Sequence, residues 1–89
     1  MAIMMIAEIA GQTPGGYEAT LKAVSEAMKS APGFLMHSAH QTETGWRVIE
    51  VWEARENSAQ FFAAHVAPNL PPGIHPKVTF QPLHAVITP

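Results

Sequence analysis

The chain has 89 residues, which is enough for one domain, residues 1–89, and too few for two independent cores. Hydrophobic residues make up 47% of the chain and charged residues 13%, against ~25% charged in typical globular domains, which excludes a disordered polyelectrolyte. The formal net charge is −2 and the sequence has no basic block, so we expect no nucleic-acid partner.

The chain contains no cysteine, which excludes disulfides, thiolate metal sites and cysteine nucleophiles. Its apolar N-terminal run, Met1–Ala7, has no basic segment before it and is interrupted by Glu8, unlike a secretion signal. No stretch approaches the ~20 apolar residues that cross a bilayer. We therefore expect a cytoplasmic protein with no membrane partner.

The N-terminal third predicts a strand followed by a helix. Residues Ile3–Ala10 form an apolar run that ends at Gly11, which predicts a strand buried on both faces. Thr13 and Pro14 then mark a helix start, as N-cap and first helical residue. Ala31-Pro32-Gly33 ends this helix, and its apolar side consists of Tyr17, Leu21, Val24 and Met28.

The remaining segments predict two strands, a helix and a last strand. The runs Phe34–Gln41 and Trp46–Glu53 flank the hairpin turn Thr42-Glu43-Thr44-Gly45. A helix is predicted from about Ala54 to Ala67, with Phe61, Phe62 and Val66 on its apolar side and Pro68 limiting it. After a proline-rich loop, a strand is predicted over Lys77–Ile87, in which Pro82 restricts the pairing.

The predicted order is strand, helix, strand, strand, helix, strand. This is the βαββαβ pattern of ferredoxin-like domains, an α+β fold with a four-stranded antiparallel sheet. A doubly wound parallel sheet would need a helix between the two middle strands, where only a four-residue turn is available.

A turn centred on Glu43-Thr44 predicts the hairpin register. His37 then lies opposite Glu50, and the same face carries three further pairs, namely Leu35 with Trp52, Ala39 with Val48 and Gln41 with Trp46. The other face carries Met36, Ser38 and His40 opposite Val51, Ile49 and Arg47. Both faces are substantially apolar, whereas two helices cover only one, so we expect a homodimer that packs sheet against sheet.

Several segments resemble the small dimeric α/β-barrel proteins related to antibiotic-biosynthesis monooxygenases. The matching segments are Pro32–Ala39, Gly45–Glu53, Arg55-Glu56, Phe61, Val66-Ala67-Pro68 and Pro82–Val86. The resemblance implies a ferredoxin-like protomer whose sheet packs on that of a second protomer to form a barrel. It also implies a ligand cavity between sheet and helices, suited to a hydrophobic small molecule of the aromatic or polyketide kind.

The same resemblance bears on activity. The cofactor-free monooxygenases of this group use an Asn and a Trp in the cavity to activate an aromatic polyketide with oxygen. Trp52 stands at a position resembling the Trp of that motif. The only asparagines, Asn57 and Asn69, both lie outside the predicted strands, so the Asn half of the motif is missing.

His37 and Glu50 are the candidate catalytic residues. A carboxylate opposite an imidazole holds one tautomer and makes the ring a usable general base. The alternative is a structural pair in which each residue satisfies the other inside the sheet.

Three further residues are candidates for ligand binding. Trp52 lies on the same face and could stack on a flat ligand or fill core volume. Tyr17, near the start of the first helix, could direct its hydroxyl into the cavity or lie at the sheet edge. His84 matches the last-strand His of the resembling proteins. No residues have metal-ligand spacing and no phosphate or dinucleotide loop occurs, so we expect no metal and no cofactor.

Three functions remain open from the sequence. The first is a cofactor-independent monooxygenase acting on an aromatic small molecule. The second is a polyketide cyclase or isomerase that uses His37 as its base. The third is a non-catalytic dimer with a ligand-binding or structural role.

Overall fold

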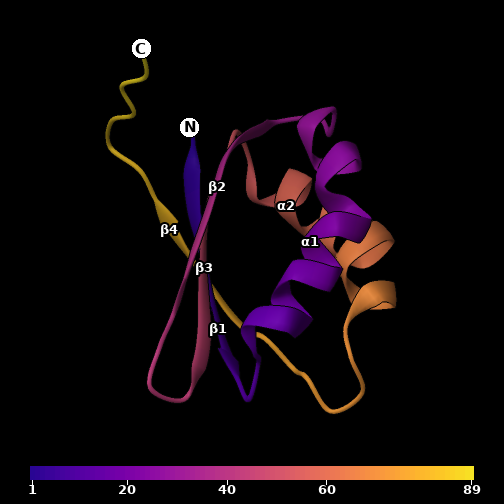
Figure 1. Cartoon of the computed structure of the whole chain (residues 1–89). Coiled ribbons are helices and arrows are strands. Elements are labelled where there is room, and N and C mark those ends of the chain that lie inside the picture. The colour runs from indigo at the N-terminus through magenta and orange to yellow at the C-terminus, as the bar shows by residue number, and fades with distance from the viewer.

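Four antiparallel strands form one sheet, in the order β2-β3-β1-β4, and both helices cover the same face of it (Figure 1). The computed structural model describes all 89 residues. The elements are β1 (Ile3–Ala10), α1 (Pro14–Lys29), β2 (Phe34–Gln41), β3 (Gly45–Trp52), α2 (Arg55–Phe61) and β4 (Lys77–Pro82). This is the predicted βαββαβ arrangement, so the predicted α+β fold is confirmed. No helix is both long enough and apolar enough to span a bilayer.

Helix α1 begins and ends where its sequence signals predict. The Thr13 hydroxyl accepts a hydrogen bond from the Gly16 N–H at 3.0 Å, which satisfies one of the free donors of the first turn. After the helix, Gly33 has a φ of 78°, a left-handed conformation that favours glycine, and it leads the chain into β2. Val24 and Met28 are buried, so the predicted apolar side of the helix faces the sheet.

All three hairpin pairs predicted on the outer face are confirmed, and on the helix-facing side three of the four predicted pairs are confirmed. His37 lies opposite Glu50, Ala39 opposite Val48, and Gln41 opposite Trp46. The fourth pair is wrong, because an irregularity between Phe34 and Met36 places Phe34 opposite Trp52 instead of Leu35. The extra residue breaks the two-residue alternation of the strand, so Leu35 is 44% exposed while the Phe34 ring packs edge-on against Trp52 at 5.3 Å.

Two predicted boundaries in the C-terminal half were wrong. The second helix is regular only over Arg55–Phe61 and continues as a π-helical segment, Phe62–Val66, and a short turn, Ala67–Asn69. Pro68 has no N–H to offer to the preceding turn, which disfavours a regular α-helix here. The last strand ends at Pro82 and does not reach Ile87, since beyond it only the Leu83 N–H bonds back toward β1, to the oxygen of Ala2 just before that strand. Figure 1 shows the tail leaving the sheet beside the N-terminus.

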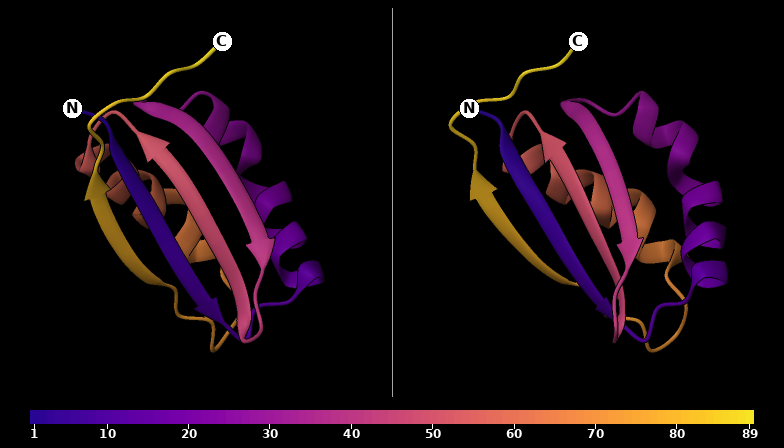
Figure 2. Two further views of the ribbon diagram at one scale, coloured as in Figure 1. Left: turned by 90° about the vertical axis from the view of Figure 1, so that its left-hand side faces the viewer. Right: turned by 60° about the vertical axis from the view of Figure 1, so that its left-hand side comes forward.

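The opposite face of the sheet has no covering layer in a single chain. Figure 2, in its left panel, shows this outer face toward the viewer, with the helices behind the strands. In β1, Met5, Ala7 and Ile9 are buried under the helices, whereas Met4 and Ile6 on the outer face are half-buried. The prediction of a β1 strand buried on both faces is therefore wrong for one chain taken alone.

Candidate functional site

A cavity that is partly open to solvent lies between the sheet and the helices. Twelve of its 18 lining residues are hydrophobic. Both helical segments and three strands contribute to it, including Leu21, Val24 and Met28 from α1, and Phe62 and Val66 from the π-helical segment. A mostly apolar wall with few polar groups is typical of a site for a small organic molecule.

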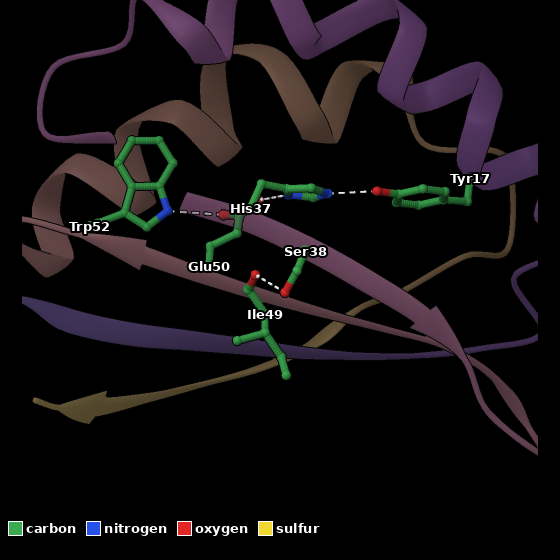
Figure 3. Close-up of polar contacts among 6 residues, drawn as sticks. All are labelled: Tyr17, His37, Ser38, Ile49, Glu50 and Trp52. Atoms are coloured by element: carbon green, nitrogen blue, oxygen red, sulfur yellow. Dashed lines mark hydrogen bonds and ion pairs between the residues drawn. The ribbon is translucent and has the colours of Figure 1, made fainter. Parts of the chain in front are cut away.

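Three polar residues of the cavity wall, Tyr17, His37 and Glu50, form one hydrogen-bonded series with Trp52, and these four residues are named the relay (Figure 3). The Tyr17 hydroxyl lies 2.6 Å from His37 Nε2, and His37 Nδ1 lies 2.6 Å from Glu50 Oε2. Trp52 Nε1 donates to Glu50 Oε1 at 2.9 Å. The series therefore connects α1, β2 and β3 across the helix-facing side of the sheet.

The chemistry of Glu50 determines the direction of every hydrogen bond in the relay. An ionised carboxylate only accepts, and an indole N–H only donates, so Glu50 receives a proton donor at each oxygen. His37 Nδ1 must then hold a proton toward Glu50. In the neutral ring Nε2 is left as an acceptor, and the Tyr17 hydroxyl donates to it.

Tyr17 is the one member of the relay that lies on a helix, α1. Its ring stacks on Trp46, with ring centroids 4.9 Å apart. Burial raises the pKa of the Tyr17 phenol above its ordinary value, and the negative charge of Glu50 raises that pKa further. At neutral pH Tyr17 is therefore a neutral phenol that donates to His37 and keeps oxygen lone pairs for a ligand.

The structure brings four of the five predicted site residues together and leaves one outside. His37, Glu50 and Tyr17 line the cavity, whereas Trp52 is fully buried, lies outside the lining and reaches the site only through Glu50. His84 is exposed, lies beyond the end of β4 and does not line the cavity. Its family-based placement in a strand was wrong, because the strand ends at Pro82.

The two asparagines also lie outside the cavity. Asn57 is on α2 and packs close to Gly33, and Asn69 bonds to the backbone oxygen of His65. No three His, Asp or Glu side chains lie close enough together to hold a metal ion.

Two buried polar residues that the sequence analysis did not single out line the cavity. Gln12, in the turn before α1, is 6% exposed, and Ser58, on α2, is 5% exposed. Ser58 stands three residues before Phe61 on the apolar side of its helix, and a polar residue at such a position is a signal that could have been noticed. Gln12 lies in a turn, where periodicity gives no signal.

Comparison with solved structures places this architecture among known proteins. SnoaB from Streptomyces nogalater, a cofactor-independent oxygenase, superposes with a TM-score of 0.74 at 13% identity, over 97% of this chain and 96% of SnoaB. This chain has the ferredoxin-like fold of that oxygenase. A protein from Bordetella bronchiseptica assigned to the antibiotic-biosynthesis monooxygenases gives a TM-score of 0.64 at 17% identity, over 94% of this chain and 98% of its own.

A third structure of the same fold contains a ligand. The monooxygenase ActVA-Orf6 of Streptomyces coelicolor, in complex with nanaomycin D, gives a TM-score of 0.57 at 19% identity, over 99% of this chain and 91% of its own. No protein-family model and no curated protein sequence matches the chain. The resemblance drawn from the sequence is thus confirmed at the level of the fold.

Proposed function

We propose that this protein binds a small, flat and mostly apolar molecule in its cavity and removes a proton from it through the relay. The observation behind this proposal is the pair of 2.6 Å hydrogen bonds that join Tyr17 to His37 and His37 to Glu50 at the wall of an apolar cavity. Such a series has a base, His37, a carboxylate that orients it, and a hydroxyl that meets the ligand.

The proposed step moves two protons. The substrate gives a proton to the Tyr17 oxygen while Tyr17 passes its own proton to His37 Nε2. The products are a substrate anion and a His37 imidazolium, whose positive charge Glu50 stabilises at 2.6 Å. When the proton returns by the same route the relay regains its resting state, so no cofactor takes part in the transfer.

Two fates of the substrate anion separate two candidate functions. The similarity in fold to SnoaB, a cofactor-independent oxygenase, favours reaction of the anion with oxygen. The placement of Asn57 and Asn69 outside the cavity favours the second candidate, a cyclase or isomerase that returns the proton elsewhere on the substrate.

A hydrogen–deuterium exchange assay tests the proposal. We use tetralone, a flat bicyclic ketone with acidic C–H groups beside its carbonyl, and follow their exchange in heavy water by NMR. We expect catalysed exchange by the wild type and a loss of about 100-fold or more in His37→Ala. His40→Ala is the matched control, since His40 lies on the same strand but is exposed on the outer face.

Exchange by the wild type no faster than in buffer would overturn the proposal. An oxygen electrode run in parallel distinguishes the two candidates, because an oxygenase consumes oxygen along with the substrate whereas an isomerase consumes none.

We also propose that two copies of the chain pair through their outer sheet faces. The supporting observation is an apolar patch on that face, made of Met4, Ile6, Met36 and Ile49, which no helix covers. Met36 alone is 39% exposed, although it lies in the middle of a strand. Burial of such a patch is a favourable driving force for association.

A further inference from the structure

Gln12 is a buried amide whose NH₂ group has no partner in the protein. It is 6% exposed and lies in the turn between β1 and α1. Its Oε1 accepts a hydrogen bond from the Thr13 N–H at 3.1 Å. The side chain packs over Gly16, where a Cβ would overlap this oxygen, so the glycine makes room for the amide.

The position of the Gln12 nitrogen follows from that bond. A backbone N–H can only donate, so the amide atom that faces Thr13 must be Oε1. The other terminal atom of the amide is therefore Nε2. No protein group bonds to this nitrogen, and it is not sealed off, since Trp46 Nε1 is the only fully enclosed side-chain donor or acceptor without a partner. Gln12 itself lines the cavity.

An N–H on the wall of an apolar cavity becomes costly when an occupant shields it from solvent and does not accept a hydrogen bond from it. Leaving such a donor without a partner costs about 1–3 kcal/mol. An occupant that covers this nitrogen is therefore favoured when it presents an acceptor, since an amide N–H cannot be satisfied by another hydrogen-bond donor.

We propose that Gln12 Nε2 donates a hydrogen bond to a carbonyl oxygen of the substrate and stabilises the negative charge that forms there during proton removal. The inference rests on the proposed function and adds the substrate class, a carbonyl compound with an acidic hydrogen on the neighbouring carbon. Gln12 is then a catalytic residue, because it touches the oxygen that gains charge.

The step balances within the substrate and the relay. The C–H bond beside the carbonyl breaks, its electron pair forms a carbon–carbon double bond, and the carbonyl π pair moves onto oxygen. The proton goes to Tyr17, and the Tyr17 proton goes to His37. Gln12 adjoins Thr13, the N-cap of α1, and the partial positive charge of that helix end favours an oxyanion at the same place.

Gln12→Glu is a sharp test because it changes one atom and keeps the structural bond. The carboxylate still accepts from the Thr13 N–H, and a negative charge is favourable at a helix N-terminus, so we expect the fold to be retained. At mildly alkaline pH the carboxylate is ionised and presents an acceptor where the amide presented a donor. We expect tetralone exchange to slow by about 100-fold, as when one oxyanion-stabilising donor is lost.

Binding measurements supply a readout that does not depend on turnover. We expect Gln12→Glu to weaken tetralone binding about tenfold and to leave the binding of naphthalene, which has no oxygen, unchanged. Gln60→Glu is the matched control, since Gln60 is exposed on α2 and lies outside this cavity. In the wild type, the side-chain amide signal of Gln12 should shift on addition of tetralone and not of naphthalene.

The outcomes separate this inference from the proposed function. Equal tetralone binding and exchange in Gln12→Glu and wild type, or an unmoved Gln12 amide signal, would overturn the role of Gln12 while the relay proposal stands. Absence of exchange in the wild type would overturn the relay proposal, and the binding and NMR results would still decide whether Gln12 meets a carbonyl.

Discussion

At the scale of single residues, Glu50 organises the site. It is 6% exposed, and each of its oxygens accepts one N–H, from His37 and from Trp52. The burial of a carboxylate is costly unless it is paired, and these two donors are what make it tolerable inside the sheet. The tautomer of His37, and through it the donor role of Tyr17, follows from that carboxylate.

Glu50→Gln should reverse the direction of the hydrogen bonds that His37 makes in the relay, without unfolding the protein. The amide oxygen can accept from Trp52 while its NH₂ donates to His37 Nδ1. His37 then holds its proton on Nε2 and donates to the Tyr17 oxygen, so each of the three contacts in the relay keeps one donor and one acceptor. We expect a small change in the free energy of unfolding, a reversed His37 tautomer by nitrogen NMR, and a loss of exchange activity. An unchanged tautomer with full activity would contradict this account.

The phenol of Tyr17 should titrate above its ordinary range. Burial and the charge of Glu50 both raise its pKa in the folded state, so its contribution to stability is complete below the ordinary tyrosine pKa. That contribution is lost as the pH rises through the raised value. Tyr17 is the only tyrosine, so the ultraviolet absorbance of tyrosinate reports it alone.

We expect the native midpoint of this titration to lie above the midpoint in concentrated urea. Glu50→Gln should lower the native midpoint by removing the smaller of the two causes, while burial still holds it up. A native midpoint at or below the denatured one would show that Tyr17 is solvated.

At the scale of secondary-structure elements, the end of β3 joins the site to the core. Trp52 has no exposed surface, and its ring packs against Phe34 from β2 and Phe61 from α2. The same indole holds Glu50 through its N–H. Trp52, the most deeply buried side chain of the protein, therefore anchors Glu50 and limits how far it can move.

Trp52→Ala should destabilise the fold by about 3–5 kcal/mol, as large aromatic truncations in cores do. Denaturant melts followed by far-ultraviolet circular dichroism measure this loss. Trp46→Ala is a useful comparison, because Trp46 is only partly buried and stacks on Tyr17, so its removal should cost less. If Trp52→Ala had the same free energy of unfolding as the wild type, the packing of Trp52 would not stabilise the core.

At the scale of the whole molecule, the helices cover one side of the sheet only. The outer face has its apolar patch at one end, and a charged row at the other, in which Arg47 bonds to Glu8 and lies 3.3 Å from His40. An apolar patch beside a polar edge is a common arrangement of a protein–protein interface. A second copy of the chain is the occupant that we propose for it.

We expect sedimentation or light scattering to show a dimer at micromolar concentration. Met36→Lys places a charge within the apolar patch and should yield a monomer, whereas Ala23→Lys on the exposed side of α1 should not. A wild-type protein that is monomeric under these conditions would contradict the sheet-to-sheet pairing.

The sequence alone determined the features that depend on local backbone geometry. The spacing of Tyr17, Val24 and Met28 predicted the helix face, and the turn after Gln41 predicted the pairing of His37 with Glu50, because helices and strands have fixed periods. Pro82 predicted restricted pairing in the last strand, and in the structure the strand ends at this residue.

Only the tertiary structure decided which distant residues meet. The bulge at Leu35, the hydrogen bond from Tyr17 to His37 twenty positions away, and the free N–H of Gln12 beside the cavity are not encoded by any period in the sequence. They depend on where α1 rests over the sheet, and that position is set by the joint packing of side chains from every element. The sequence therefore predicted the pair at the centre of the site, and the fold supplied the groups that surround it.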